Sequence, residues 1–194
     1  MNTTIIIFAN SVKHGGYCIA GKDELFHQWV RLVSNVEGKE LDHRFKGIQP
    51  LQKIEINFPK HVPLMTQPEN HLMPEKLYSA GRLKISDLIN YLDTPNSLWG
   101  RKNCVGHAQV INITHSLYLV KVCDLHLFRT SEGKRRARFN YAGICYNLPV
   151  TDPNFEQHLV KPEHREILCV SLGEKYDPAG GENYSHYKIV ATIL

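Results

Sequence analysis

The sequence lacks the features that would assign a membrane, secreted or disulfide-rich class. No apolar run approaches the roughly 20 residues that a membrane-spanning helix needs. The first residues have neither the basic start nor the long apolar segment of a secretory signal. The five cysteines are odd in number and widely scattered, which disfavours a disulfide framework and favours reduced, buried thiols. From these absences we predict a cytoplasmic protein that does not bind membranes.

Motifs for catalysis and metal binding are also absent. The sequence has no phosphate-binding lysine loop, dinucleotide glycine pattern, nucleophile elbow or H-E-x-x-H. Cys123 and His126 form a single C-x-x-H without a second pair at the spacing of a zinc site, so we expect no metal. Asp152 and Glu174 fit turn chemistry better than acid catalysis. We therefore expect a non-enzymatic protein without a cofactor.

The composition that is present is ordinary for a globular protein, with a small excess of positive charge. The 194 residues are 42% hydrophobic and 22% charged, which is enough to bury a core without covalent cross-links. The formal net charge is +4. This excess suggests a polyanionic partner, but many enzymes have the same balance, so the placement of the charges has to decide.

Short β-strands dominate the hydrophobic pattern. Between residues 53 and 58 apolar and polar side chains alternate, as in a strand with one buried face. Prolines between residues 59 and 74 predict an extended connection, and Ser86 is placed to cap a short helix over 87–92. Strands are predicted over 3–9, 17–21, 29–33, 52–58, 105–113, 116–128, 136–148, 167–172 and 187–194.

The segment 93–96, Asp-Thr-Pro-Asn, ends the predicted helix and marks a boundary between two halves. We therefore predict two domains, residues 1–95 and 96–194. Each half contains several short strands and few helices, which predicts a mainly β protein. The pattern suits a small barrel or a sandwich, and periodicity alone leaves both open.

The most positive stretch is "RTSEGKRRAR", residues 129–138. If it forms a hairpin, Arg136 and Arg138 lie on one face of the second strand, and Arg135 lies on the other with Phe139 and Tyr141. Cationic groups that contact phosphates, beside rings on which bases stack, are typical of proteins that bind single strands. The alternative is a solvated hairpin tip whose charges discourage aggregation through the strand edge.

A second candidate segment is "KHGG", in which Lys13 and His14 precede Gly15 and Gly16. Paired glycines either shape a tight turn or offer backbone N–H groups to a phosphate, and the spacing favours the turn. Arg31, two residues after Trp29, either contacts a ligand or flanks a buried indole ring.

Seven segments of the sequence form an ordered set: "FANSVKHGGYCIAGK", "WVRLVS", "QPEN", "LWG", "FNYAGICYNLPVTDP", "LCVSLGEKYDP" and "YKIVATIL". In this order they resemble the dual OB-fold domain family, a bacterial family often encoded near mobile-element conflict and phage-defence genes. The resemblance runs from about residue 6 to the C-terminus, and it implies two OB-type β-barrels and a role in nucleic-acid binding.

The leading hypothesis is a non-enzymatic module that binds nucleic acid, with single-stranded DNA or RNA favoured, as an accessory subunit of a defence or mobile-element system. An adaptor that binds a protein partner in a defence complex is the alternative. A third possibility, an enzyme or small-ligand sensor, directs attention to Gly180 and Gly181. The nucleic-acid-binding residues that we expect are Lys13, His14, Gly15, Gly16, Tyr17, Arg31, Lys134, Arg135, Arg136, Arg138, Phe139 and Tyr141.

Overall fold

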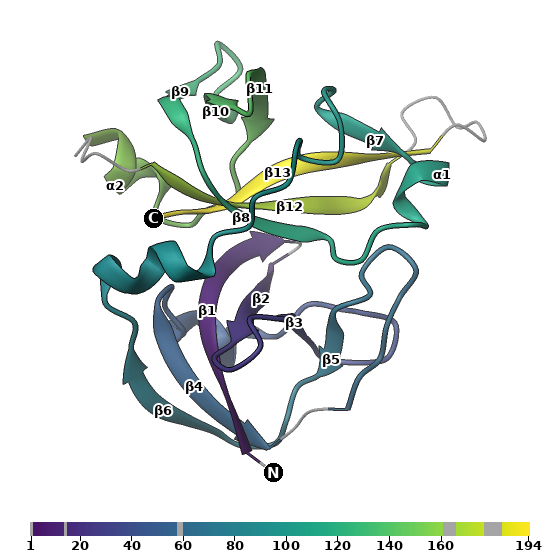
Figure 1. Cartoon of the computed structure of the whole chain (residues 1–194), viewed down its shortest axis with the longest axis vertical. Coiled ribbons are helices and arrows are strands. Elements are labelled where there is room, and N and C mark those ends of the chain that lie inside the picture. Colours follow the sequence, from purple (N-terminus) through teal and green to yellow (C-terminus); the bar gives the residue numbers. More distant parts are fainter. Residues whose placement is uncertain (1, 14, 58–59, 161–165, 177–183) are drawn as a thin grey trace. The chain divides into compact units, whose positions relative to one another are not determined.

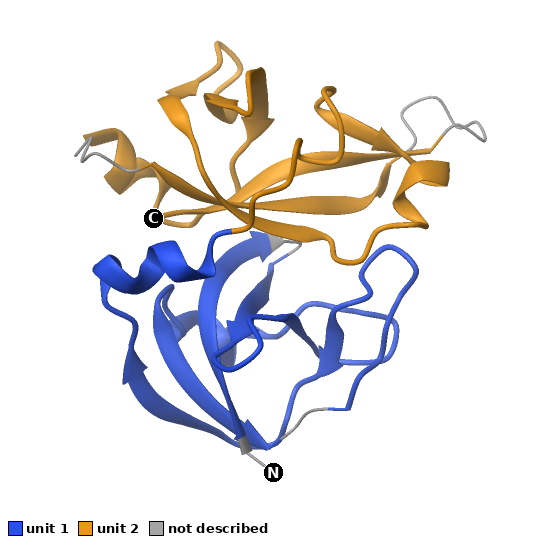
Figure 2. Ribbon diagram, viewed as in Figure 1, with its two compact units in different colours: residues 1–92 blue, residues 93–194 orange. Residues whose placement is uncertain are grey.

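A computed structural model describes residues 2–13, 15–57, 60–160, 166–176 and 184–194. The chain divides into two compact units, Met1–Leu92 and Asp93–Leu194, which Figure 2 shows in blue and orange. Curled sheets of short strands make up most of both units, and the described helices are short. The prediction of a mainly β fold is therefore confirmed.

The first unit contains one six-stranded sheet in the order β5-β3-β2-β1-β4-β6 (Figure 1). Neighbouring strands are antiparallel except β3 and β5, which are parallel. Its described elements are β1 (Asn2–Lys13), β2 (Gly16–Asp23), β3 (Trp29–Val33), the 3-10 helix η1 (His43–Gly47), β4 (Gln52–Asn57), β5 (Asn70–Leu72), β6 (Leu77–Arg82) and the 3-10 helix η2 (Ile85–Tyr91).

The core of the first unit is an aliphatic cluster around β1. Ile5 and Ile7 pack with Ile19, Leu32 and Ile54 from the flanking strands, and all five side chains are buried. The backbones of β1 and β2 approach so closely that a Cβ at residue 21 would lie 2.1 Å from the carbonyl oxygen of residue 6. Only glycine fits there, which explains why the second strand contains one.

The second unit contains two sheets, a four-stranded one in the order β7-β13-β12-β8 and a three-stranded one in the order β11-β10-β9. All strand pairs in both sheets are antiparallel. Its described elements are β7 (Cys104–Gly106), α1 (His107–Val110), β8 (Leu117–Lys121), β9 (Cys123–Arg129), β10 (Arg135–Tyr141), β11 (Ile144–Pro149), α2 (Phe155–Val160), β12 (Ile167–Tyr176) and β13 (Ser185–Ile193).

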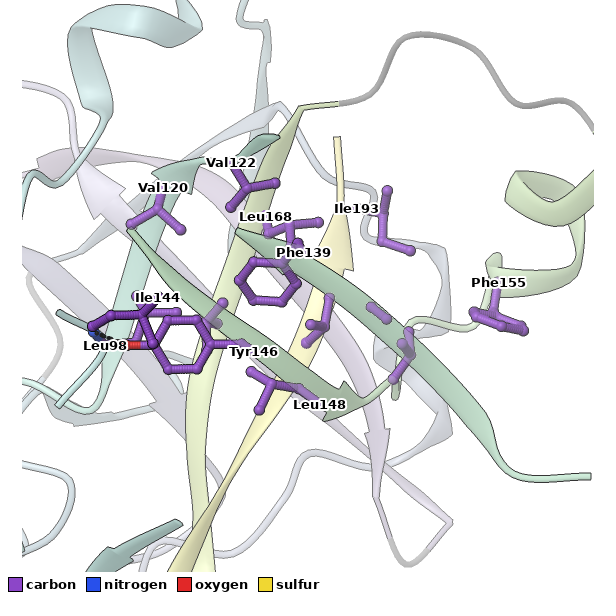
Figure 3. Packing of buried hydrophobic residues seen from close by; sticks show 14 residues of the cluster. Leu98, Val120, Val122, Phe139, Ile144, Tyr146, Leu148, Phe155, Leu168 and Ile193 are labelled. Atoms are coloured by element: carbon purple, nitrogen blue, oxygen red, sulfur yellow. Dashed lines mark hydrogen bonds between the residues drawn. The ribbon is translucent and has the colours of Figure 1, made fainter. Parts of the chain in front are cut away.

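Both sheets of the second unit contribute to its hydrophobic core (Figure 3). Phe139 of β10 and Tyr146 of β11 lie side by side, with ring centroids 5.7 Å apart. They pack in one cluster with Leu168 and Ile193 from the four-stranded sheet. Along β11 buried residues alternate with more exposed ones, so the three-stranded sheet has an inner, apolar face and an outer, solvated face.

Three predicted strands are wrong in their extent because turns interrupt them. The range 105–113 contains the short helix α1 after β7, so the strand ends at Gly106. The range 116–128 passes from one sheet to the other at Val122, between β8 and β9. The range 136–148 is a hairpin rather than one strand, because Ala142 and Gly143 both adopt positive φ, 48° and 72°, as a two-residue hairpin turn requires.

The predicted helix over 87–92 is also corrected. It is the 3-10 helix η2, which begins two residues earlier, and its start has no side-chain cap. The hydroxyl of Ser86 donates instead to the carboxylate of Asp87, 3.0 Å away. Leu88 points inward, whereas Ile89 is 65% exposed.

All five cysteines are free thiols, as expected, but they are not all buried. Cys169 is buried, and Cys123 and Cys145 are exposed on the three-stranded sheet. Among the described residues, no helix is both long enough and apolar enough to cross a membrane.

Candidate nucleic-acid interface

The segment 129–138 forms the predicted hairpin between β9 and β10. Arg129 pairs with Arg135 across the two strands, and Gly133 in the turn has a φ of 77°. The amide of Thr130 donates to the carbonyl of Lys134, which closes the turn at 3.0 Å. The register of this hairpin decides which side chains share a face of the sheet.

The inner face of β10 is apolar and covered. Ala137 is fully buried and Phe139 is 1% exposed, so the expectation that Phe139 stacks on a base is wrong. Tyr141 is half-buried, and its hydroxyl donates to the carbonyl of Pro95 at 2.7 Å. Burial also raises the pKa of Tyr141. This ring is therefore held by its own unit rather than presented to a ligand.

The outer face of β10 carries Arg136 and Arg138. Arg138 is exposed, and its side chain makes no ion pair or hydrogen bond to any described residue. Arg136 is half-buried, and its guanidinium donates from Nε to the side-chain oxygen of Asn147 at 2.9 Å and from Nη2 to the backbone oxygen of the same residue. These contacts fix its orientation, and its other N–H groups have no acceptor among the described residues, so Arg136 is suited to bind an anion.

Two rings that were not expected lie beside these arginines. In the register of β9 and β10, Phe128 is opposite Arg136 and His126 is opposite Arg138. The two rings are nearly parallel, with an interplanar angle of 20° and centroids 5.5 Å apart. The signal for them was in the sequence, because a hairpin centred on "SEGK" places Phe128 across from Arg136. The expected stacking rings, Phe139 and Tyr141, lie along the same strand as the arginines instead.

The remaining cations of the hairpin have carboxylate partners. Lys134 pairs with Glu132 at 2.5 Å on the exposed turn. Arg135, on the other face of β10, pairs with Glu156 at 3.2 Å, and Arg129 pairs with the same carboxylate. These three cations are therefore partly neutralised, which makes them weaker candidates for phosphate contacts than Arg138.

The glycine pair of "KHGG" shapes the turn between β1 and β2. Gly15 has a φ of 83°, and a Cβ on Gly16 would lie 2.9 Å from the carbonyl oxygen of Leu41. Tyr17 and Leu41 exchange two backbone hydrogen bonds at that point, and the half-buried Tyr17 ring packs on the core of the first unit. The turn interpretation is confirmed. The side chain of Lys13 and the whole of His14 lie outside the described residues, as do Gly180 and Gly181.

Arg31 is not available for the expected phosphate contact. Its side chain is 8% exposed, and its Nε lies 3.0 Å from a carboxylate oxygen of Glu69, whose side chain is 2% exposed. The two residues also share a backbone hydrogen bond of 2.9 Å between β3 and the segment before β5. This buried ion pair fixes the first unit internally, so the expected binding role of Arg31 is corrected to a structural one.

A loop before β7, residues 98–103, presents two further cations, Arg101 and Lys102, which are both exposed. The fully buried Lys188 of β13 donates from Nζ to the carbonyl oxygens of Gly100, at 2.8 Å, and Lys102. The hydroxyl of Tyr146 donates to the same Gly100 oxygen at 2.9 Å. Burial lowers the pKa of Lys188 to about 8. A buried cation and a core tyrosine therefore hold this loop in one conformation.

The loop contacts the three-stranded sheet at its edge strand β11. The side-chain oxygen of Asn103 accepts a hydrogen bond from the backbone amide of Asn147 at 3.4 Å, and Asn147 is the residue that holds Arg136. We use the name cationic strip for the cations of this loop together with the cations and rings of the outer face. Its members are Arg101, Lys102, His126, Phe128, Arg136 and Arg138.

A model of the family described as "Dual OB-containing domain" matches residues 3–193 of the sequence. The chain belongs to this dual OB-containing domain family. A comparison with curated proteins finds no match. Among solved structures, the crystal structure of the tetrameric p202 HIN2 is similar over 99% of this chain and 88% of that one, with 11% sequence identity and a TM-score of 0.32. A likeness at that level says nothing about function.

Several of the segments that suggested the dual OB-containing family have structural roles in this chain. The arginine of "WVRLVS" and the glutamate of "QPEN" form the buried Arg31–Glu69 pair. Asp152, in the fifth segment, accepts hydrogen bonds from the amides of Asn154 and Ile193 and is 2% exposed, which fits the expected turn role. Among the described residues, no cluster of three or more histidine, cysteine or acidic side chains is placed to hold a metal ion.

Proposed function

We propose that the chain is a cytoplasmic, non-enzymatic module that binds single-stranded nucleic acid by its backbone along the cationic strip. The observation that carries the proposal is the arrangement on the outer face of the three-stranded sheet. There Arg136 and Arg138 lie directly across from Phe128 and His126. Phosphates would contact the guanidinium groups, and a base would stack on the neighbouring rings.

Membership in the dual OB-containing family supports this proposal, because OB-type barrels commonly bind oligonucleotides and oligosaccharides on a sheet face. The inference is one from fold and surface together, since the fold alone does not determine a function. The setting that we propose is that of an accessory subunit in a bacterial defence or mobile-element system.

The test is a fluorescence-anisotropy titration of a labelled single-stranded oligonucleotide with the wild-type chain and with an Arg136→Gln/Arg138→Gln variant. We expect the double variant to bind about tenfold more weakly, because two phosphate contacts are lost. A duplex of the same sequence should bind more weakly than the single strand, because its bases are stacked and not free to meet the rings.

Arg82→Gln is the matched control. Arg82 is an exposed arginine of the first unit whose guanidinium, within the described part of the chain, hydrogen-bonds only to the backbone carbonyl of Pro50. It should bind the oligonucleotide as the wild type does. Equal loss of binding in both variants would mean that general charge, and not the cationic strip, holds the strand. Absence of binding to the wild type even at low salt would reject the function.

One observation favours the protein-adaptor alternative. The turn between β2 and β3 presents two adjacent large apolar side chains, Leu25 at 80% and Phe26 at 77% exposure. Asp23 fixes the turn by accepting hydrogen bonds from the amides of both residues and of Gln28. If the chain is an adaptor, Leu25→Ser/Phe26→Ser should abolish recovery of a stoichiometric partner while oligonucleotide binding is unchanged.

A further inference from the structure

A cavity of about 840 Å³ lies in the second unit beside the loop 98–103. Trp99, Val105 and Ile113 contribute apolar walls, and Gln109 and Ser185 contribute polar groups. Small-molecule sites are typically concavities of about 300–1,000 Å³ with mostly apolar walls and a few polar groups that orient the ligand. The cavity therefore has the size and the lining of a ligand site.

Two positive charges line the cavity. Arg101 and Lys102 are exposed, and neither forms an ion pair with a carboxylate in the described parts of the chain. The backbone that carries them is fixed by Lys188 and Tyr146. Two cations that have no carboxylate partner among the described residues favour a phosphate group on the ligand.

A smaller cavity in the first unit gives a useful contrast. It has a volume of about 390 Å³, and its lining includes Asp42 and Glu75. Arg44, which also lines it, makes a 2.7 Å ion pair with Asp42, and Glu75 adds a further negative charge. The described lining is therefore net acidic, and this cavity has no comparable preference for an anion.

The aromatic wall of the larger cavity favours a planar ring. Trp99 packs against Tyr118, with ring centroids 4.4 Å apart and ring planes tilted by 32°. It has a positive φ of 51°, which is uncommon for a bulky residue. Its buried indole N–H has no hydrogen-bond acceptor within the described residues. Such local strain and unsatisfied donors are found at binding sites more often than elsewhere. The amide of Gln109 is able to pair with the edge of a base.

We propose that this cavity binds a nucleotide, with the base against Trp99 and the phosphate between Arg101 and Lys102. The inference deepens the proposed function, because the nucleotide would be an unstacked residue of a bound strand. The same chemistry also fits a free nucleotide, and the experiment separates the two sources.

The test uses the full chain in equilibrium dialysis against labelled adenosine 5′-monophosphate at low salt, with adenosine and inorganic phosphate as competitors. Saturable binding of the nucleotide is expected. Neither adenosine alone nor inorganic phosphate alone should displace it effectively. Arg101→Gln/Lys102→Gln should weaken binding at least tenfold, because both phosphate partners are removed. The two substituted side chains are exposed, so the fold is retained, and the first-unit control Arg82→Gln should bind the nucleotide as the wild type does.

A parallel titration with a single-stranded oligonucleotide distinguishes the two proposals. If the oligonucleotide binds but the mononucleotide does not, and Arg101→Gln/Lys102→Gln leaves oligonucleotide binding unchanged, the cavity proposal is overturned. Strand binding is then assigned to Arg136 and Arg138 on the outer face of the sheet alone. If the mononucleotide binds and the oligonucleotide does not, the cavity is a site for a free nucleotide and the strand-binding function is rejected. Equal binding by the wild type and the double variant also overturns the cavity proposal.

Discussion

At the scale of single residues, the cations of this chain divide into those that hold the fold and those that face solvent. Arg31 and Lys188 are buried, and each is satisfied by groups of its own unit. Arg138 and Arg101 are exposed and have no carboxylate partner among the described residues. A count of positive residues does not separate these classes, because burial and pairing decide which charges remain for a ligand.

The Arg31–Glu69 pair predicts a large effect on stability. Arg31→Met leaves a buried carboxylate without its partner, so the free energy of unfolding should fall by about 3–5 kcal/mol. Urea denaturation of the full chain measures this change. Arg31→Met/Glu69→Leu should recover much of the loss, since an apolar pair has no uncompensated charge. If Arg31→Met were as stable as the wild type but did not bind an oligonucleotide, Arg31 would be a binding residue and not a structural one.

Lys188 predicts a dependence of stability on alkaline pH. Its pKa in the folded chain is about 8, below the ordinary value of 10.5, so between these values the unfolded chain binds more protons than the folded one. The free energy of unfolding should therefore rise with pH above 8, by up to about 1.4 kcal/mol per pH unit from this group. The penalty for burying the charged amine is fully present below pH 8.

Urea denaturation of the wild type and of Lys188→Met between pH 7 and 9.5 tests this sign. The methionine variant loses two hydrogen bonds to the loop 98–103, so it should be less stable overall. It should also lack the part of the rise that comes from Lys188. Parallel curves for the two proteins would show that the amine has an ordinary pKa in the folded state.

At the scale of elements, the three-stranded sheet β11-β10-β9 has two different faces. Its inner face contains Phe139 and Tyr146 in the core, and its outer face contains the two arginines across from Phe128 and His126. Since the side chains of a strand alternate between faces, a shift of one residue in the register would exchange the two sets. The turn at Gly133 sets this register, so it also determines which side chains form the outer face.

Phe128 provides the element-scale prediction. Phe128→Ala removes a ring from the outer face, where it is not part of the core cluster, so stability should change little. Affinity for a single-stranded oligonucleotide should fall by about 1–3 kcal/mol, the usual contribution of one stacked base. Phe139→Leu is the contrasting variant, because a core substitution should lower stability and leave the affinity of the folded protein unchanged. If Phe139→Leu weakened binding and Phe128→Ala did not, Phe139 in the core would be the stacking ring instead.

The sequence alone predicted the strands with clear alternation or β-branched residues, and it predicted the hairpin over 129–138. It did not predict the turn at Ala142, because alanine rarely adopts positive φ and the apolar residues continue on both sides. It also did not show that Phe139 belongs to the core and Phe128 to the outer face. Both rings lie in apolar, strand-like sequence, and only the register of the hairpin and the position of the core distinguish them.

At the scale of the whole molecule, a formal charge of +4 is spread over two units with different surfaces. In the second unit the hydrogen bonds through Asn103 and Asn147 connect the loop 98–103 to the outer face of the sheet. In the proposed function this connection joins the exposed cations Arg101, Lys102, Arg136 and Arg138 into one track for the strand. Membership in the dual OB-containing family was predictable from ordered segments, but this track was not, because it is assembled by tertiary contacts.

The salt dependence of oligonucleotide binding tests the central claim most directly. If the four cations of the track each neutralise a phosphate, a plot of log affinity against log salt should have a slope of about −3 for the wild-type chain. In Arg136→Gln/Arg138→Gln the slope should fall to about half of that value, because two of the four contacts are lost. An unchanged slope in the double variant, or wild-type affinity that does not vary with salt, would contradict the account.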